Sequence, residues 1–464
     1  MLPTRYGHRH TIGISRRELL QVGSSGLLGI GLSGIVAGRA RTAEVRQANS
    51  KRPAKPRSVL LIFLTGAASQ LDLFDLKPDA PAEIRGEFKP VATKTTGVQI
   101  SEHLSRLAAL SDKWAMVRSF SHRENNHLLA SHMVLTGALV PGGFFDKVAS
   151  RTDYPCYASA LDYVRPRNDG VPSGITLPTH LVEGPLTWPG QHAGFLGSTH
   201  DPWMINQDPN SPKFRVENLS MPAEFNIDRI NDRKALLDQV QKQQRQLADT
   251  AETKLLAKQQ EQALTILTSG KVARAFELDR EPDAVRDRYG RHMFGQSLLL
   301  SRRLIEAGVP VVQANMGRVQ TWDHHGNIFP TLKNNLLPPL DRGVSALLED
   351  LDLRGLLENT FVLMLGEFGR TPKISGQPSD KSPGRDHWAS SFSGIFAGGG
   401  VRGGQVIGKT DKIGAYPTTT PYSYADIAAT VYHVLGIDPD VDVQDRQGRP
   451  VRLNTGQAIL PLFS

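Results

Sequence analysis

Short apolar runs alternate with amphipathic segments along the chain. Apolar runs bounded by Gly or basic residues are typical of strands buried on both faces of a sheet. Segments whose apolar residues recur every three or four positions, and which end at Gly, are typical of helices packed on a core. The predicted strands are 59–64, 114–119, 309–314, 361–365 and 392–397, and the predicted helices are 103–110, 128–135, 294–307, 336–352 and 424–435.

Strands and helices alternate in this order, which predicts an α/β fold with a largely parallel sheet and helices on both faces. The pattern stops over residues 154–222, which are rich in Pro, Gly and Trp and indicate a long binding loop or lid. Residues 228–269 contain no Pro or Gly and predict a long helix or helical hairpin lying on the body of the protein. We therefore expect one domain over residues 58–464, with a loop-rich and helical insertion over about 154–290.

The N-terminus has the pattern of an export signal. Ser15-Arg16-Arg17-Glu18-Leu19-Leu20 precedes a weakly apolar, Gly-rich stretch and small residues up to Ala40, as in twin-arginine signals. We predict a signal peptide over residues 1–40 and a linker rich in Arg, Lys and Pro over residues 41–57. The protein is thus expected to use the twin-arginine export machinery and to be periplasmic or extracellular.

Charge and cysteine content narrow the classes of partner. The 464-residue chain has a net charge of +8, but residues 1–40 hold five arginines and one glutamate, which leaves +4 for the remainder. No basic patch interleaved with aromatic residues occurs, so nucleic acid is not an expected partner. The apolar stretch of the signal is too short and too rich in Gly for a stable membrane span. The single cysteine, Cys156, cannot form an internal disulfide.

Polar residues suited to metal chemistry follow the buried strands. Glu367 comes directly after one strand, where the carboxyl edge of an open α/β sheet binds ligands. A polar loop then leads to His387, which should return to the same edge, and a carboxylate with a histidine predicts part of a metal site. Asp323 and His325 follow another strand and are compatible with ligating a divalent ion, or with a His-rich surface loop.

Two further polar groups have alternative interpretations. Asn126 and His127 begin the helix 128–135 after a strand, where free N–H groups favour an anion, although Asn126 also suits a helix cap. Asp72 and Asp75 lie beyond the first strand, either as residues of a first helical turn or as groups that orient a ligand.

Several motifs, in order along nearly the whole chain, together carry a family resemblance. They are residues 66–78, 126–137 and 191–197, Trp322-Asp323-x-His325, residues 366–372, and Arg385-Asp386-His387-Trp388. With the export signal, they resemble the exported family called domain of unknown function 1501, which is placed in the alkaline phosphatase and sulfatase superfamily. The resemblance implies a three-layer α/β/α sandwich with a mostly parallel central sheet. It also implies a metal-dependent phosphoester or sulfoester hydrolase site at the carboxyl edge of that sheet.

The resemblance implies roles for individual residues. Asp323 with His325 or Asn327, and His387, match the first metal site of the superfamily. Glu367 takes the place of the strand-end aspartate of its second metal site. The implied metal is divalent, with zinc first and calcium, manganese or iron as alternatives.

The sequence departs from the superfamily at three positions. The helix at Asn126-His127 resembles the sulfatase nucleophile helix, but Asn or His stands in the slot of its opening Cys or Ser. Thr65-Gly66 stand where superfamily members carry a metal-binding aspartate, and Phe368 stands where the second acid is followed by His or Asn. The attacking group is therefore left open between His127, a serine (Ser121 or Ser131) and a water activated by the metal.

Two functions from different classes are compatible with these residues. The first is an exported metal-dependent hydrolase of an anionic small-molecule or polysaccharide ester of phosphate or sulfate. The second is a catalytically silent exported binding or surface-assembly protein that retains the fold. Arginines such as Arg118 either clamp an anion or lie exposed at the surface. The expected catalytic residues are Asn126, His127, Arg370 and Arg385, and the expected metal ligands are Asp323, His325, Glu367 and His387.

Overall fold

The computed structural model describes residues 58–143, 148–216, 271–375 and 382–464. The signal peptide predicted over 1–40, the linker over 41–57 and the long helix over 228–269 lie outside the described residues. In the part of the chain that is described, no helix is both long and apolar enough to span a membrane.

An eight-stranded sheet forms the centre of the described residues, in the order β14-β4-β13-β10-β1-β9-β5-β8. Its neighbouring strands pair in parallel except at β13, which is antiparallel to both β10 and β4. This confirms the predicted, largely parallel sheet. The strands are β1 (Ser58–Phe63), β4 (Trp114–Phe120), β5 (Gly174–Leu177), β8 (Trp203–Met204), β9 (Val311–Asn315), β10 (Thr360–Leu365), β13 (Phe392–Ala397) and β14 (Gln405–Ile407).

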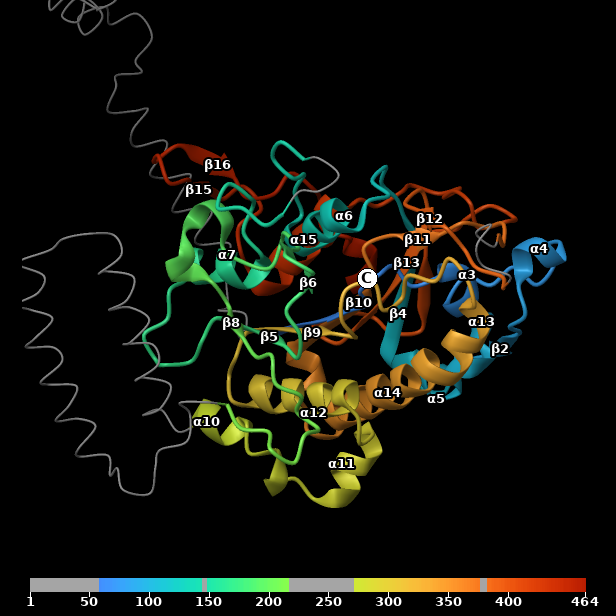
Figure 1. Ribbon diagram of the computed structural model, residues 1–464, viewed down its shortest axis with the longest axis horizontal. Coiled ribbons are helices and arrows are strands. Elements are labelled where there is room, and N and C mark those ends of the chain that lie inside the picture. The colour runs from blue at the N-terminus through green and yellow to red at the C-terminus, as the bar shows by residue number, and fades with distance from the viewer. Residues whose placement is uncertain (1–57, 144–147, 217–270, 376–381) are drawn as a thin grey trace, which may run out of the picture. The chain divides into compact units, whose positions relative to one another are not determined.

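Helices cover both faces of the sheet, which gives the predicted three-layer α/β/α arrangement (Figure 1). In Figure 1, α12 and α14 lie on one side of the strands, and α6, α7 and α15 lie on the other. The predicted helices over 128–135, 294–307, 336–352 and 424–435 are confirmed with bounds shifted by at most a residue. These layers consist of α6 (His127–Thr136), α7 (Tyr157–Val164), α12 (Met293–Glu306), α14 (Leu337–Leu353) and α15 (Tyr424–Leu435).

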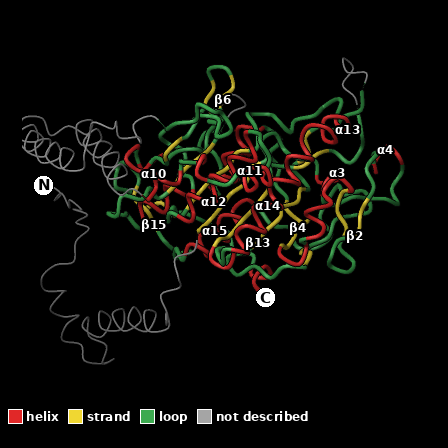
Figure 2. The backbone as a smooth tube through the Cα atoms, turned by 90° about the horizontal axis from the view of Figure 1, so that it is seen from below, coloured by secondary structure: helices red, strands yellow, loops and turns green. Residues whose placement is uncertain are grey.

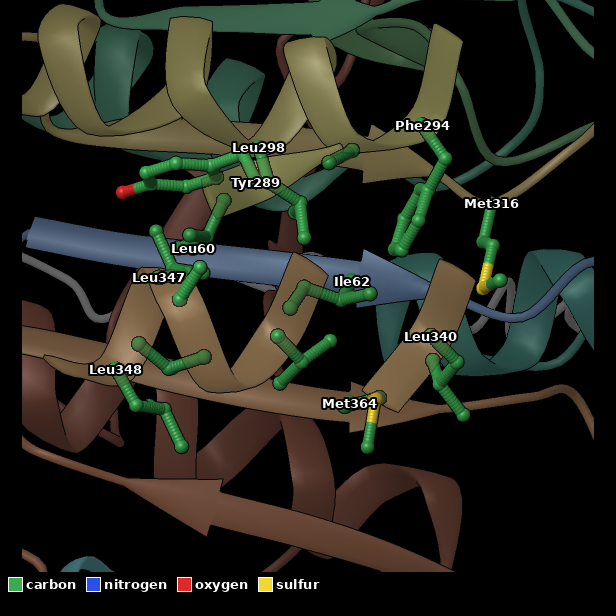
Figure 3. Packing of buried hydrophobic residues seen from close by; sticks show 14 of the residues in the cluster. Leu60, Ile62, Tyr289, Phe294, Leu298, Met316, Leu340, Leu347, Leu348 and Met364 are labelled. Carbon is green, nitrogen blue, oxygen red and sulfur yellow. The ribbon is translucent and has the colours of Figure 1, made fainter. Parts of the chain in front are cut away.

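The central strand β1 separates two hydrophobic cores because successive side chains of a strand point to opposite faces. Leu60 and Ile62 belong to the core beneath α12 and α14, whereas Leu61 and Phe63 belong to the core beneath α6, α7 and α15. Figure 3 shows Leu60 and Ile62 packed among side chains of α12 and α14. Burying one such aliphatic side chain contributes about 1.5–3 kcal/mol, which explains why the apolar runs locate the strands so well.

Shorter elements connect these layers. Figure 2, which views the molecule from below, shows α12 and α14 beside each other, with α11 and α10 near them. The shorter helices are α3 (Gln70–Leu73), α4 (Ala82–Arg85), α5 (Ser105–Ala109), α10 (Lys271–Ala275), α11 (Asp283–Tyr289) and α13 (Ile328–Thr331). The small two-stranded sheets pair β2 (Pro90–Ala92) with β3 (Gln99–Ser101), β6 (Val182–Glu183) with β7 (Leu186–Thr187), β11 (Gly369–Arg370) with β12 (His387–Trp388), and β15 (Asp442–Gln444) with β16 (Pro450–Arg452).

Part of the segment expected to be a loop-rich and helical insertion, residues 154–290, belongs to the layers of the central sheet. It supplies α7 and two strands of the central sheet, β5 and β8. These strands are too short to produce a readable apolar run, and they are flanked by Pro and Gly. Gly174 in β5 is required by packing, because a Cβ there would lie 2.1 Å from the Cβ of Ala158 in α7. Close approach of helix and strand therefore explains a Gly that the sequence pattern assigns to a loop.

Candidate metal centre

Side chains from several strand ends meet at the carboxyl edge of the parallel strands. Asp323 and His325 lie on the loop after β9, His387 lies on β12, and His127 opens α6 after β4. We call His127, Asp323, His325 and His387 the His–Asp cluster. Each of its members follows or precedes a buried strand, so the rigid sheet determines their relative positions.

Helix α6 presents His127 to this edge. Asn126 is the N-cap residue, and its side-chain oxygen accepts hydrogen bonds from the backbone N–H groups of Leu128 and Leu129. The helix ends at Gly137, which adopts the left-handed conformation with φ of 79°. Asn126 therefore occupies the helix-cap role that the sequence left open, and it fixes the position of the following histidine.

Asp323 is the centre of the cluster. Its Oδ1 lies 2.9 Å from His325 Nε2 and 3.2 Å from His387 Nε2. Its Oδ2 lies 3.1 Å from His127 Nε2. His127, Asp323 and His387 offer ligand-type atoms, imidazole nitrogens and a carboxylate oxygen, that lie within 4.8 Å of one another, a spacing that suits a metal ion. His325 Nε2 borders this group through Asp323 and His387.

The other ring nitrogen of each histidine is held by an oxygen acceptor. His325 Nδ1 lies 2.6 Å from a carboxylate oxygen of Asp386, and His127 Nδ1 lies 2.6 Å from one of Glu367. His387 Nδ1 lies 2.8 Å from the backbone carbonyl oxygen of Asn125. Because these oxygens accept hydrogen bonds, each Nδ1 carries the proton and each Nε2 is left with its lone pair in the neutral ring. This is the arrangement by which proteins orient metal-binding histidines.

The spacing of the nitrogen and oxygen atoms in the cluster suits coordination of a divalent cation better than hydrogen bonds among the side chains themselves. The Nε2 atoms of His325 and His387 lie only 3.1 Å apart. His127 Nε2 is buried and, among the described residues, has no hydrogen-bond partner of good geometry, although Asp323 is close. Where the rings are neutral, their converging Nε2 lone pairs repel one another, and a proton, or a cation that replaces it, removes the repulsion.

The carboxylates dominate the electrostatics of the cluster. Burial by itself would raise the pKa of Asp323, but the three histidines and Arg370 outweigh it and hold that pKa far below its usual range. Burial would likewise lower the pKa of His127, yet Asp323 and Glu367 on either side of the ring raise it to about 9. Without a cation, His127 is therefore protonated at neutral pH.

Glu367 lies behind His127 and does not face the point where the cluster converges. Its fully buried carboxylate accepts the backbone N–H groups of Gly66 at 2.9 Å and Ala67 at 3.1 Å, in addition to His127 Nδ1. Gly66 and Ala67 both have positive φ, which turns their N–H groups toward the carboxylate. The structure therefore places His127, where the sequence analysis expected Glu367, among the ligand-type groups.

Aromatic rings enclose His127. The ring of Phe368 stacks on it at 4.8 Å between centroids and 30° between planes, and that of Trp188 lies on it at 5.8 Å and 21°. His325 and His387 are about one-quarter exposed, whereas His127 is 5% exposed. Access from solvent to the cluster is therefore on the side of His325 and His387.

The two arginines expected in the site are buried, and each pairs with a different carboxylate. Arg370 donates to Asp323 Oδ1 at 2.6 Å and to the backbone carbonyl of Ala67 at 2.8 Å. Arg385 lies farther away and forms a bidentate ion pair with Asp72 at 2.8 and 3.1 Å, with both side chains fully buried. Both guanidinium groups therefore bond to acceptors of the described protein residues.

Some residues that shape the site carried no assignment in the sequence analysis. Asp386 orients His325, and the carbonyl of Asn125 orients His387. Asp386 precedes His387 in the sequence. An acidic residue next to a candidate metal ligand could have indicated that it orients a histidine of the site. Ser131, a candidate nucleophile, lies one turn beyond His127 with a buried hydroxyl that has no hydrogen-bond partner among the described residues.

Comparison with known proteins gives one family match. A model of the family described as "Protein of unknown function (DUF1501)" matches residues 56–463. The chain matches no curated protein sequence.

Similar solved structures were also found. The PsFucS1 sulfatase from Pseudoalteromonas sp. has 12% identity and a TM-score of 0.34 over 87% of this chain and 72% of that chain. The lipoteichoic acid synthase LtaP from Listeria monocytogenes has 11% identity and a TM-score of 0.35 over 87% and 75%. An alkaline phosphatase from the Antarctic bacterium TAB5 has 11% identity and a TM-score of 0.34 over 82% and 99%.

Proposed function

Because the chain belongs to the DUF1501 family, which resembles the alkaline phosphatase and sulfatase superfamily, we propose that it is an exported metal-dependent hydrolase of phosphate or sulfate esters. The observation that carries the proposal is the convergence of three Nε2 atoms on Asp323, each ring held at Nδ1 by an oxygen acceptor. The twin-arginine pattern at Arg16 and Arg17 supports export.

The charge of the site explains why such a hydrolase would depend on a metal. Three carboxylates, those of Asp323, Glu367 and Asp386, face one guanidinium, that of Arg370, which leaves two negative charges. The proton on His127 offsets one of them in the metal-free protein at pH 7. This charge repels an anionic ester and attracts a divalent cation. When bound, the cation would neutralise the non-bridging oxygens of the ester and act as a Lewis acid.

The residues of the chain then have separate tasks. His127, Asp323, His325 and His387 would hold the ion, with Asp386 and Glu367 fixing the ring orientations. Arg370 would keep Asp323 ionised and tied to the loop after β1. Phe368 and Trp188 would exclude water behind His127, so that the ester approaches from the side of His325 and His387.

The ligand set favours one transition-metal ion per chain. Three imidazole nitrogens and one carboxylate suit zinc, iron or manganese, whereas calcium and magnesium prefer oxygen ligands. The carboxylate of Glu367, which the family resemblance assigns to a second metal, is already bound by two backbone N–H groups and His127. We therefore propose zinc first, at a single site.

The direct test is elemental analysis combined with hydrolysis assays. We expect the protein recovered from the exported fraction to contain about one zinc per chain and to hydrolyse an aryl phosphate or aryl sulfate in a metal-dependent manner. His387→Ala should lose both the metal and the turnover, because it removes one of the four ligands.

His200→Ala is the matched control for that test. His200 also pairs with a carboxylate, Asp162, at 2.7 Å, but outside the cluster. The control should retain metal and turnover. Wild type that binds no metal and hydrolyses neither ester would overturn the proposal.

Metal uptake is expected to release protons in a pH-dependent way. With a pKa of about 9, His127 is protonated in the metal-free protein at pH 7, and a cation must displace that proton to reach Nε2. Zinc affinity should therefore rise with pH until about pH 9, with about one proton released from His127 at pH 7. Calorimetry in buffers of different ionisation enthalpy measures this release. His127→Ala should release one proton fewer, and an affinity that is constant from pH 6 to 9 would contradict the assignment of His127.

One observation favours the alternative function, a catalytically silent binding or surface-assembly protein. The first turn of α6 holds no Ser, Thr or Cys, and its cap and first residue are committed to the helix N–H groups and to Glu367. Such a protein would contain the same zinc and lose it in His387→Ala, yet show no turnover with either ester. Metal content and turnover, measured together, therefore separate the two functions.

A further inference from the structure

A separate cavity lies at the carboxyl edge of the sheet, next to the strand ends that carry the His–Asp cluster. Its volume is about 440 Å³, within the range of roughly 300–1,000 Å³ typical of small-molecule sites. Pro178, which directly follows β5, and Asn315, the last residue of β9, line it. β9 pairs with β1, so the cavity occupies the neighbouring position along this edge. No member of the cluster is among its lining residues.

The body of the cavity is apolar. Phe294 and Met316 are buried at its inner wall, and Met293, Leu336 and Pro339 are half-buried around it. The side-chain amide of Asn315 is also there, but it is already satisfied, because its nitrogen donates to the carbonyl of Thr179 and its oxygen accepts from Gln313. A ligand would therefore find mainly hydrophobic contact inside.

The polar groups at the mouth are cationic or neutral. Arg342 is exposed and carries the one permanent charge among the lining residues, and no carboxylate of the described residues lines the cavity. The Nε and Nη2 atoms of Arg342 donate to the backbone carbonyls of Arg288 and Asp287, which hold the guanidinium in place without neutralising its charge. His292 accepts a hydrogen bond at Nδ1 from the N–H of Gly295, which leaves the proton on Nε2 as a donor. Burial, and then the charge of Arg342, lower the pKa of His292, so its ring is neutral at pH 7.

The wall of the cavity is shared with the loop that carries Asp323. Gly317 and Thr321 line the cavity, and Thr321 is two residues from Asp323. Two hydrogen bonds hold this loop against Thr65, which follows β1. The Thr65 hydroxyl donates to the carbonyl of Arg318, and the Trp322 N–H donates to the carbonyl of Thr65. The same loop therefore lines the cavity with Gly317 and Thr321 and contributes Asp323 to the His–Asp cluster.

From these features we infer that the cavity is a second binding site, for a small organic monoanion with an apolar body. The apolar part would lie against Phe294 and Met316, and the anionic group would lie at the mouth beside Arg342. The positive mouth and the absence of lining carboxylates select against cations, and the apolar interior selects against small inorganic anions. This inference does not rest on the proposed hydrolase function.

A pair of fluorescent probes tests the inference. Anilinonaphthalene sulfonate and phenylnaphthylamine share an apolar body, and only the first carries a sulfonate. We expect the sulfonate to bind the full-length protein at one site per chain, and Arg342→Gln to weaken this binding about fivefold, as for the loss of one charged contact at an exposed group. Binding of the neutral probe should be unchanged in Arg342→Gln.

Blocking variants and a matched charge control complete the test. Met293→Trp from the wall, or Asn335→Trp from the exposed rim should the first not fold, is expected to abolish binding of both probes. Arg280→Gln removes an exposed arginine outside the cavity and should change neither. His387→Ala should also bind both probes normally, which separates this site from the cluster. Sulfonate binding that is unaffected by Arg342→Gln and by both blocking variants would overturn the inference.

Discussion

Asp323→Asn is expected to abolish both metal binding and ester hydrolysis. The side chain keeps its shape, but the centre of the cluster loses the negative charge that three imidazoles and Arg370 approach. Loss of a partner that only orients a ligand costs roughly 10–100-fold in metal affinity, so loss of the central carboxylate should cost more than about a hundredfold. Zinc titration against a chelator and turnover of the aryl esters measure the two effects.

The control for Asp323→Asn is Asp201→Asn. Asp201 also forms a close ion pair, with Arg151 at 2.6 and 2.7 Å, but at the protein surface and outside the cluster. This variant should retain zinc and turnover. If Asp323→Asn kept zinc at wild-type affinity, the assignment of the metal centre would be wrong, whatever happened to turnover.

Arg385→Met is expected to lower the free energy of unfolding by about 3–5 kcal/mol, because it leaves the carboxylate of Asp72 buried without its ion-pair partner. Both side chains are fully buried, and Arg385 also donates to the backbone carbonyls of Thr371, Pro372 and Ile84. Urea denaturation measures the change. The folded variant should retain zinc, since Arg385 is not part of the His–Asp cluster.

Two comparisons make the interpretation of Arg385→Met secure. The double variant Asp72→Asn with Arg385→Met should recover part of the lost stability, because no buried charge is then left unpaired. Arg151→Met, which breaks the surface pair with Asp201, should change stability far less, since solvent screens that pair. A catalytic role for Arg385 would instead leave stability unchanged and reduce turnover at saturating substrate.

The sequence predicts the fold well where burial alone decides the structure. β1 and β10 are continuous apolar runs, and the observed strands, Ser58–Phe63 and Thr360–Leu365, differ from the predicted bounds by at most one residue. β5 was not predicted, because a four-residue strand with Gly at its start and Pro after it has no periodic signal. Its place in the sheet depends on tertiary packing with α7 and β9.

The sequence predicted which residue types gather at one edge of the sheet. It did not predict the directions in which their side chains point. Glu367 follows β10 as expected, yet its carboxylate is bound by the backbone N–H groups of Gly66 and Ala67. The residue type does not predict that a backbone N–H group is turned by a positive φ, particularly at Ala67. In the same way, Asp72 and Arg385 were each noted, but their pairing depends on two loops that meet only in the folded chain.

The reversed strand β13 has a consequence for how the site assembles during folding. A parallel strand brings to the carboxyl edge the residues after it, whereas an antiparallel strand brings the residues before it. Glu367 comes after β10 and His387 comes before β13, so one short stretch of chain supplies both without a crossover helix. Contacts between residues close in sequence cost little loop-closure entropy. We therefore expect this part of the centre to assemble early, with Asp323 and His127 joining as the more distant strands dock.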